Sequence, residues 1–258
     1  MRLDRLNAME QYVLQNGTAT LEDLAKHFSV SANTIRRDVN ELLERDRIKK
    51  VYGGVSIKAA QSPLPISVRS SKCAAEKLII GRLASTLVED NSTIFLDSGS
   101  TTTTLLPNIV TRQQITMVTH SLPAMYEASK YEKLKVVALG GIYNAATSSY
   151  FGVSTIETLS RMTINTVFIA ATGVSLERGL TNTTYLEAEI KRCITSREQC
   201  VVLMADHTKF GYSSMITFCD FEKLFAVVTD RLPPPPFLEV IQRKGIKLLC
   251  PETMPGSI

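Results

Sequence analysis

The feature that most constrains the fold is an alternation beginning near Glu76, in which short apolar runs rich in β-branched residues are separated by amphipathic stretches. Strands of a parallel sheet are buried on both faces, and each needs a helical crossover to the next. The alternation therefore predicts an α/β domain with a mostly parallel sheet covered by helices. The predicted strands are 93–97, 115–119, 134–139, 167–171, 200–205 and 224–229, with a last apolar segment at 246–249.

The first 58 residues follow another pattern, short helices and then a basic hairpin. The run Ser62-Pro63-Leu64-Pro65 then interrupts regular structure, because proline lacks an amide donor. We expect one domain over residues 1–58, a linker over 59–75 and a larger domain over 76–258. A chain of 258 residues, 44% of them hydrophobic, is long enough to bury both cores.

Composition excludes several classes of protein. A net charge of +4 is too small to identify a polyanionic partner, so the distribution of charge must decide. No run of about 18 apolar residues could span a bilayer and no signal-peptide pattern is found, so we expect a cytoplasmic protein without a membrane partner. The cysteines form no C-x-x-C pair and have no histidine at ligand spacing, so we expect neither a metal nor a cofactor.

The N-terminal domain contains a candidate recognition helix that begins at Ser31, after a capping-box pattern at Thr20 and Asp23 and a turn at Ser29-Val30. Apolar residues at 35, 39, 42 and 43 share its inner face, and polar residues share the opposite face. Arginine can pair with guanine, asparagine can pair with adenine, and a helix N-terminus can approach phosphate. The alternative for Arg36 and Arg37 is a solvated charged face. The candidate DNA-binding residues of the helix are Ser31, Asn33, Thr34, Arg36, Arg37 and Asn40.

An adjoining hairpin favours the DNA-binding interpretation. Runs 48–52 and 55–58 flank Gly53-Gly54, a strong signal for a two-residue hairpin. Lysines on such a wing can hold phosphates, which adds affinity that falls with salt and carries no sequence information. The wing lysines are Lys49, Lys50 and Lys58, and the candidate DNA-binding residues of the wing are Lys49, Lys50, Tyr52 and Gly53.

Three stretches of this domain resemble the DNA-binding signature of the DeoR family of bacterial transcriptional regulators. They are Arg5-x3-Met9-x3-Val13, Val30-Ser31-x-x-Thr34-Ile35-Arg36-Arg37-Asp38-Val39 and Lys50-Val51-Tyr52-Gly53-Gly54-Val55. The sequence departs from the family at Asp46-Arg47, where a glycine usually precedes the wing. The resemblance implies a winged helix-turn-helix and gives Asp38 a structural role.

In the larger domain, residues 94–102 read as an apolar strand, a small polar turn and a helix. Amides and hydroxyls at such a turn converge, and the helix dipole adds positive potential, so phosphate is the expected occupant of Ser98, Gly99, Ser100, Thr101 and Thr102. The alternative is a turn that only caps the helix. Polar groups after other strands would lie on the same sheet edge, where parallel sheets bind ligands.

Two pairs of charged residues in the larger domain are further candidates. Lys209 can supply a positive charge for a phosphate and Asp206 can accept hydrogen bonds from sugar hydroxyls, with a surface ion pair as the alternative. Glu187 and Lys191 are one helical turn apart, so a helix-stabilising pair is the default interpretation and a ligand contact is the alternative. His120 and His207 have no nucleophile at a catalytic spacing, and we expect no catalytic residues.

The DeoR resemblance extends through the larger domain. It covers Asp97-Ser98-Gly99-Ser100-Thr101-Thr102, Gly140-Gly141, Gly179-Leu180-Thr181, Glu187-Ala188-Glu189 with Lys191, and Asp206-x-x-Lys209-Phe210-Gly211. That effector domain is similar to the ribose-5-phosphate isomerase and glucosamine-6-phosphate deaminase fold, which implies a Rossmann-like α/β architecture and phosphosugar binding. The sequence departs from the family at Thr119-His120 and at Ala170-Ala171-Thr172-Gly173. The candidate effector residues are Asp97, Ser98, Gly99, Ser100, Thr101, Thr102, His120, Gly140, Gly141, Thr172, Glu187, Lys191, Asp206 and Lys209.

Together these features predict an allosteric regulator, by resemblance a repressor of a carbohydrate-metabolism operon. Its expected partners are double-stranded operator DNA, a phosphorylated sugar or polyol, and further copies of the chain in a dimer or tetramer, because symmetric heads match repeated half-sites. One alternative is a sugar-phosphate isomerase or deaminase with a DNA-binding appendage, using Asp97, Glu187, Asp206 or Lys209 as acid/base groups. Another is a larger domain that serves only assembly.

Overall fold

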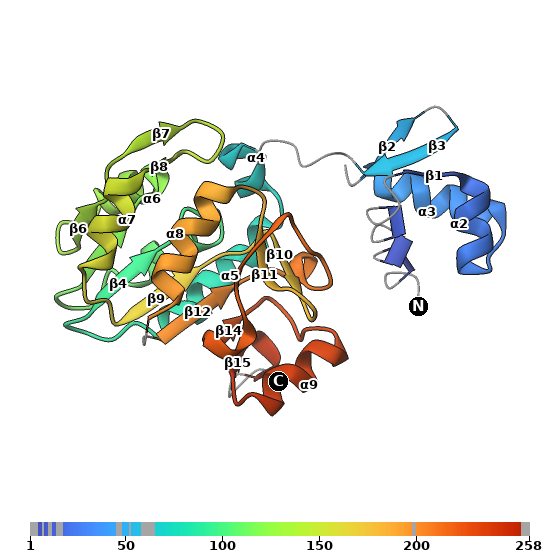
Figure 1. The fold of residues 1–258 in the computed structure, drawn as a ribbon. Coiled ribbons are helices and arrows are strands. Elements are labelled where there is room, and N and C mark those ends of the chain that lie inside the picture. The colour runs from blue at the N-terminus through green and yellow to red at the C-terminus, as the bar shows by residue number, and fades with distance from the viewer. Residues whose placement is uncertain are drawn as a thin grey trace. The chain divides into compact units, whose positions relative to one another are not determined.

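A computed structural model describes residues 5–6, 8–9, 12–13, 18–44, 48–51, 53–57, 65–197 and 200–253. The chain divides into two compact units, Met1–Gln61 and Ser62–Ile258. In Figure 1 the first unit is blue and the second runs from teal to red. Among the described residues, no helix is both long and apolar enough to cross a membrane.

The first unit is a winged helix-turn-helix, as the sequence predicts. Its elements are β1 (Thr18–Ala19), α2 (Leu21–Phe28), α3 (Ala32–Glu44), β2 (Ile48–Val51) and β3 (Gly54–Ile57), and residues 5–6, 8–9 and 12–13 are also helical (Figure 1). The strands form an antiparallel sheet in the order β1-β3-β2. Its buried core includes Leu6, Met9, Leu24, Ile35 and Val39.

Local hydrogen bonds set the helix boundaries where the sequence places them. Thr20 and Asp23 form the reciprocal capping box of α2. Ser29 ends α2 in the left-handed conformation, with φ 51°, and turns the chain toward α3. Ser31 Oγ then accepts a hydrogen bond from Thr34 N at 3.2 Å, which caps α3.

The predicted Gly53-Gly54 turn is wrong by one position. The strand register pairs Val51 with Gly54, so Gly54 is the first residue of β3. A Cβ atom at Gly54 would lie 2.3 Å from the carbonyl oxygen of Ala19 in β1. This glycine is therefore required by the close approach of a neighbouring strand.

The second unit is built on a seven-stranded sheet in the order β15-β14-β12-β9-β4-β5-β6, with every pairing parallel. Each predicted apolar run forms one of these strands, so the α/β prediction is confirmed. The strands are β4 (Thr93–Leu96), β5 (Thr116–Thr119), β6 (Lys135–Ala138), β9 (Thr166–Ile169), β12 (Cys200–Met204), β14 (Leu224–Val228) and β15 (Lys247–Leu249).

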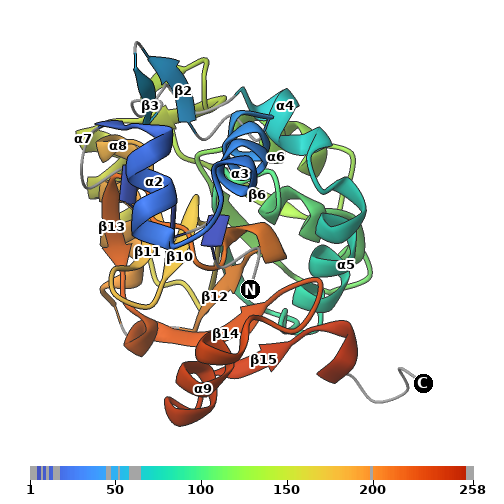
Figure 2. The same ribbon diagram turned by 90° about the vertical axis from the view of Figure 1, so that its right-hand side faces the viewer.

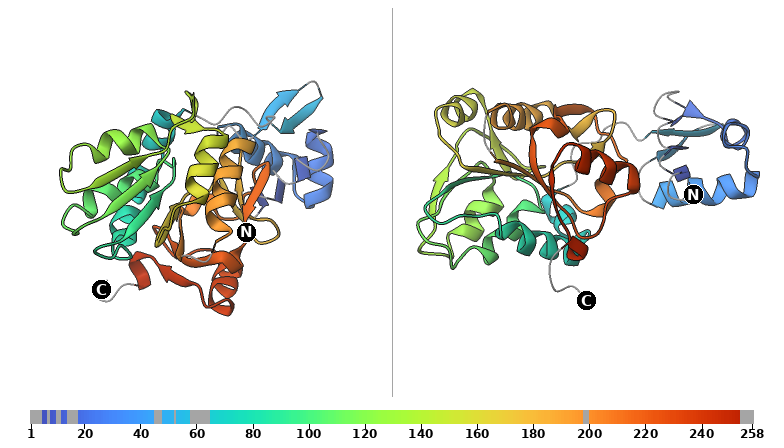
Figure 3. Two further views of the ribbon diagram at one scale, coloured as in Figure 1. Left: turned by 60° about the vertical axis from the view of Figure 1, so that its left-hand side comes forward. Right: turned by 90° about the horizontal axis from the view of Figure 1, so that it is seen from below.

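Helices cover both faces of this sheet. One face packs against α5 (Ala74–Ser85), the 3₁₀ helix η1 (Thr102–Asn108) and α6 (Leu122–Ala128), shown in Figure 2. The other face packs against α7 (Val153–Ser160), α8 (Tyr185–Thr195) and α9 (Pro235–Arg243), and Figure 3 shows α7 beside α8. Two apolar cores, one on each face, therefore hold the sheet between helical layers.

Three local features differ from the sequence-based expectation. The helix expected after Ser100 is the 3₁₀ helix η1, which contains Pro107. The range 59–75, expected to be a linker, includes α4 (Ile66–Ser71) and the start of α5. Further strands form a hairpin, β7 (Ile142–Asn144) with β8 (Ser149–Phe151), and a small sheet of β10 (Gly173–Ser175), β11 (Gly179–Asn182) and β13 (Ile216–Cys219). Short 3₁₀ helices η2 (His207–Lys209), η3 (Phe221–Lys223) and η4 (Pro251–Thr253) complete the unit.

Candidate DNA-reading surface and effector site

Helix α3 separates its residues by face as the sequence predicts. Ile35, Asp38, Val39 and Leu42 are buried. The side chains of the proposed reading face remain accessible: Ser31, Asn33, Arg36, Arg37 and Asn40 are exposed and Thr34 is half-buried. The helix therefore presents two guanidinium groups and two carboxamides to solvent.

An ion pair fixes α3 against the first helical segment. Asp38 is buried in α3, and its Oδ2 lies 2.6 Å from Nε of Arg5. The hydrogen bond to Asp38 raises the pKa of Arg5 above its ordinary value. The pair holds the inner face of α3 in place, which gives Asp38 the structural contact that the family resemblance implies.

The wing presents its lysines on opposite sides of one strand. Lys49 and Lys50 are both exposed and follow each other in β2, so their side chains leave the strand in opposite directions. Gly53 is exposed, has φ 82° and would place a Cβ atom in open space. Tyr52 and Lys58 lie outside the described residues.

At the carboxyl edge of the large sheet, Asp97 and Lys191 form a buried ion pair. Lys191 Nζ lies 3.0 Å from Asp97 Oδ2 and also donates to the Ala170 carbonyl and to Asn182 Oδ1. The backbone N–H of Ala170 donates to the same carboxylate. Burial alone would raise the pKa of Asp97, but the nearby charges, that of Lys191 first, act together with the hydrogen bonds from Lys191 and the Ala170 N–H and hold that pKa below its ordinary value.

The expected helix pair between Glu187 and Lys191 is wrong. Glu187 is buried at the start of α8, where its Oε2 accepts a hydrogen bond from Thr184 Oγ1 at 2.8 Å and its N–H donates to the same hydroxyl. Glu187 therefore belongs to the helix cap. Lys191 projects instead onto the sheet edge, because Asp97 offers it a buried countercharge.

His120 lies beside this ion pair, at the end of β5. Only 1% of the residue is exposed, and its ring stacks on Phe95 with a centroid distance of 5.8 Å and lies 5.7 Å from the ring of Phe151. Burial lowers the pKa of His120 to about 4, although the Asp97 charge opposes that effect. The imidazole is thus neutral at physiological pH. His207, by contrast, is hydrogen-bonded to Asp230.

Hydrogen bonds within the turn after β4 already engage some of its polar groups. Thr102 Oγ1 bonds to the carbonyl oxygens of Asp97 and Gly99, at 2.7 and 2.8 Å. A Cβ atom at Gly99 would lie 2.5 Å from Cβ of Ala170, so the close approach of the two segments requires glycine. Ser98 and Thr101 are buried and Ser100 is half-exposed. Thr102 and Gly99 therefore build the turn, whatever binds there.

Asp206 and Lys209 follow strand β12 at the same carboxyl edge of the sheet. Asp206 is buried, its Oδ1 accepts hydrogen bonds from the N–H and hydroxyl of Thr208, and its Oδ2 is 3.9 Å from Lys209 Nζ. Lys209 is about one-third exposed (32%). The expected alternative of a surface ion pair fails for Asp206, since its carboxylate is not at the surface.

Lys77 is a site residue that sequence analysis missed. It is only 4% exposed, and its Nζ donates a hydrogen bond to the Arg69 carbonyl. Burial lowers the pKa of Lys77 below its ordinary value. The negative charge of Asp206 raises that pKa and the positive charge of Lys209 lowers it. Its position could have been found, because Lys77 falls at helical spacing with the buried Ile80, Gly81 and Ala84 of α5.

The remaining candidate residues lie at the margin of this edge. Gly140 and Gly141 are exposed, and Gly141 has φ 140° where a Cβ atom would meet the Phe151 carbonyl oxygen at 2.5 Å. Thr172 is half-buried and contacts Thr183, whose hydroxyl lies 3.3 Å from that of Ser214. The glycines therefore shape the entry to the β7–β8 hairpin.

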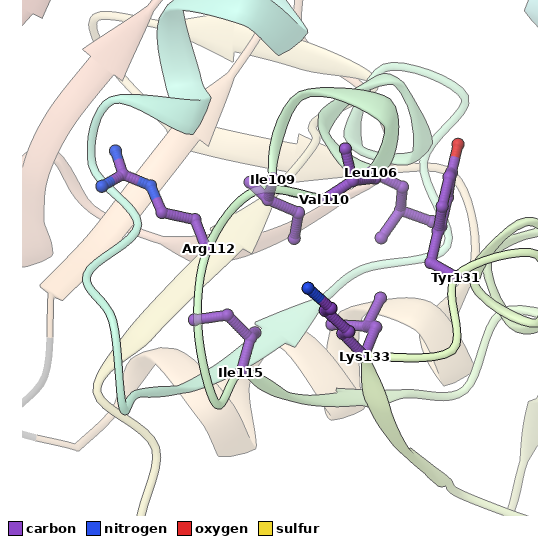
Figure 4. A pocket seen from close by; sticks show the side chains of 8 residues that line it. Leu106, Ile109, Val110, Arg112, Ile115, Tyr131 and Lys133 are labelled. Atoms are coloured by element: carbon purple, nitrogen blue, oxygen red, sulfur yellow. The ribbon is translucent and has the colours of Figure 1, made fainter.

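A pocket elsewhere in the unit is separate from these residues. Figure 4 shows its lining, which includes Leu106, Arg112, Ile115, Tyr131 and Lys133. Ile115 precedes β5 at the amino end of that strand, whereas His120 follows its carboxyl end. Among the described residues, no group of three His, Cys, Asp or Glu side chains is placed to hold a metal ion.

Models of known protein families match both units. A model of the DeoR-like helix-turn-helix domain matches residues 5–61, and a model of the DeoR C-terminal sensor domain matches residues 72–231.

Individual proteins are similar over nearly the whole chain. The HTH-type transcriptional regulator IolR of Bacillus subtilis is 38% identical over 90% of this chain and 92% of its own length. The glycerol-3-phosphate regulon repressor of Escherichia coli is 29% identical over 95% of this chain and 98% of its own. A solved ribose-5-phosphate isomerase is 18% identical over 52% of each chain with a TM-score of 0.39, a likeness too distant to bear on function.

Proposed function

The chain belongs to the DeoR family of transcriptional regulators, and we propose on that basis that it binds operator DNA through α3 and the wing and releases it in response to a phosphorylated sugar or polyol. Its relatives are named as transcriptional regulators and repressors, so it is a regulator and not an enzyme. The isomerase or deaminase alternative is therefore not favoured.

The observation that supports DNA reading is the outer face of α3. Arg36 and Arg37 are exposed there, while Ile35 and Asp38 anchor the opposite face. A helix held rigidly with arginine and asparagine side chains facing outward is suited to base edges in a major groove. Lys49, Lys50 and Gly53 on the wing would contact phosphates, and Ser31 and Thr34 would approach the backbone at the helix N-terminus.

The observation that supports effector binding is the concentration of buried charge at the carboxyl edge of the sheet. Burying an ion pair is costly unless its geometry is good, and hydrophobic residues often fill such a site without loss of stability. The edge nonetheless holds Asp97 and Lys191 on the α8 side, and Asp206 with Lys77 toward α5. We assign the effector phosphate to the turn 98–102 with Lys209, and its hydroxyls to the buried polar side chains.

Two properties of the regulator complete the proposal. It acts in the cytoplasm as a homodimer or tetramer, because two symmetric heads on paired half-sites give the discrimination that a single small head lacks. It acts as a repressor, by analogy with relatives such as the glycerol-3-phosphate regulon repressor, whose name connects that protein with a phosphorylated polyol.

Electrophoretic mobility shift of DNA upstream of the neighbouring genes tests this function. We expect the full chain to retard one fragment in excess non-specific DNA, and a sugar phosphate from a panel to reverse the shift. Equal retardation of every fragment would contradict operator recognition. A specific shift that no panel member changes would contradict sensing alone.

A further inference from the structure

Two buried polar atoms at the ends of adjacent strands have no hydrogen-bond partner among the described residues. They are Oδ1 of Asp97 and Nδ1 of His120, in residues that are 0% and 1% exposed. The other carboxylate oxygen of Asp97 is fully engaged by Lys191 and the Ala170 amide. Only one half of the carboxylate is therefore left without a donor.

The sheet register places the two residues side by side. Leu96 and Thr119 are partners across β4 and β5, so the next residues, Asp97 and His120, are neighbours one strand spacing apart, about 4.8 Å. Both side chains lie on the face that carries Phe95 and α8, since His120 stacks on Phe95 and Asp97 bonds to Lys191. An unpaired carboxylate oxygen and an unpaired imidazole nitrogen thus belong to neighbouring side chains on one face of the sheet.

Such an arrangement lowers the stability of the unliganded protein. A buried polar atom without a partner loses its bonds to water and gains nothing in exchange, and nearly all such atoms in folded proteins are paired. His120 also lies against the rings of Phe95 and Phe151, an apolar environment that favours an aromatic ring without polar atoms. Packing alone therefore gives no reason for a histidine at this position.

We propose that Asp97 Oδ1 and His120 Nδ1 together bind one hydroxyl group of a polyhydroxy ligand. The hydroxyl donates its hydrogen to the carboxylate oxygen and accepts a hydrogen bond from the Nδ1–H of the neutral imidazole. This inference rests on the proposed sensing function and assigns the polyol end of the effector to one pair of residues.

Access to the pair explains how binding would change the protein. Phe151, from β8, covers the His120 ring, and the Tyr150 N–H donates to the His120 carbonyl at 2.9 Å. Because both residues are buried, a ligand reaches the two atoms only when a covering segment moves, and the β7–β8 hairpin is a segment in contact with His120. Binding at this pair thus favours a conformation different from the closed one, which is what an allosteric sensor requires.

Thermal melting of His120→Phe in the full chain tests the proposal. Without ligand, the variant is expected to melt at a higher temperature than the wild type, because an apolar ring replaces an unpaired polar one. His207→Phe is a matched contrast, since it removes a made hydrogen bond to Asp230 and is expected to melt lower. A lower melting temperature for His120→Phe would contradict an unpaired polar atom at this position, and would overturn the proposal.

Ligand response is measured with ribose 5-phosphate, glucosamine 6-phosphate and glycerol 3-phosphate, each compared with inorganic phosphate at equal concentration. In the wild type we expect at least one of them to exceed the phosphate shift by about 2 °C or more. His120→Phe should lose that excess but keep the phosphate shift, and His120→Asn, which retains polar groups, should keep part of it. An unchanged excess in His120→Phe overturns the proposal.

The same melting-temperature measurements distinguish a failure of this proposal from a failure of the proposed function. If inorganic phosphate stabilises the wild type as much as every sugar phosphate does, anion binding stands and the hydroxyl pair is contradicted. If neither phosphate nor any sugar phosphate stabilises the wild type, sensing itself fails and the pair fails with it.

Discussion

Asp97 and Lys191 form an ion pair of 3.0 Å in which the two side chains are 0% and 4% exposed. Removing one partner leaves the other charge buried and alone, which typically costs about 3–5 kcal/mol. We therefore expect Lys191→Met to lower the free energy of unfolding of the larger unit by that order, measured by urea denaturation. The double variant Asp97→Asn with Lys191→Met should recover part of the loss. Additive losses in the double variant would contradict a direct pair.

Acidification should destabilise the protein through His120. Its pKa in the folded state is about 4, against an ordinary value of 6.5, so between these values the unfolded chain binds a proton that the folded chain excludes. Stability is then lost as the pH falls from 6.5, by about 2 kcal/mol at pH 5.

The control for this pH effect is His120→Phe, which has no imidazole to titrate and should lack this part of the loss. Asp97 does not confuse the comparison, because its pKa is held below the ordinary value of an aspartate and so outside the window. Denaturation curves at pH 7 and pH 5 measure the difference. Equal losses in the two proteins would contradict a buried neutral histidine.

The architecture was predictable because its signals are local. A strand such as β4 is a continuous apolar run, and the capping box at Thr20 and Asp23 needs only a few neighbouring residues of sequence. The outer face of α3 follows from helical periodicity alone. The β7–β8 hairpin and the β10–β11–β13 sheet were missed because their strands, unlike β4, contain polar residues or glycine and show no sustained alternation.

The site was only partly predictable because its contacts are distant in sequence. Spacing suggested Glu187 as the partner of Lys191, but the fold supplies Asp97, which no local pattern reveals. The sequence did contain a signal for the 3₁₀ helix that replaces the α-helix expected after Ser100. Pro107 and the threonines before it disfavour an α-helix there.

The wing should contribute through charge rather than through base contacts. If Lys50 holds one phosphate, Lys50→Ala reduces the slope of log affinity against log salt by about 0.9 for each reading head. Fluorescence anisotropy of labelled operator between low and moderate salt measures that slope. Lys135→Ala, at an exposed lysine of β6 in the other unit, is the control. An unchanged slope in Lys50→Ala would remove this lysine from the interface.

Lys209 should separate DNA binding from effector response. Its side chain is partly exposed and its charge lies beside Asp206, so Lys209→Ala is expected to leave operator affinity unchanged while weakening release by a sugar phosphate at least tenfold, a loss of about 1.4 kcal/mol. Lys247→Ala, at an exposed position of β15, should behave as the wild type. A normal response in Lys209→Ala would place the phosphate elsewhere.

The most direct test of the account is operator affinity in Arg36→Ala and Arg37→Ala, measured by fluorescence anisotropy beside Lys135→Ala. Both arginines are exposed, so their removal should leave the melting temperature unchanged. An arginine that pairs with a base should, when replaced by alanine, weaken binding by about 1–3 kcal/mol, or roughly 5- to 150-fold. Wild-type affinity in both arginine variants would contradict the assignment of α3 as the helix that reads DNA.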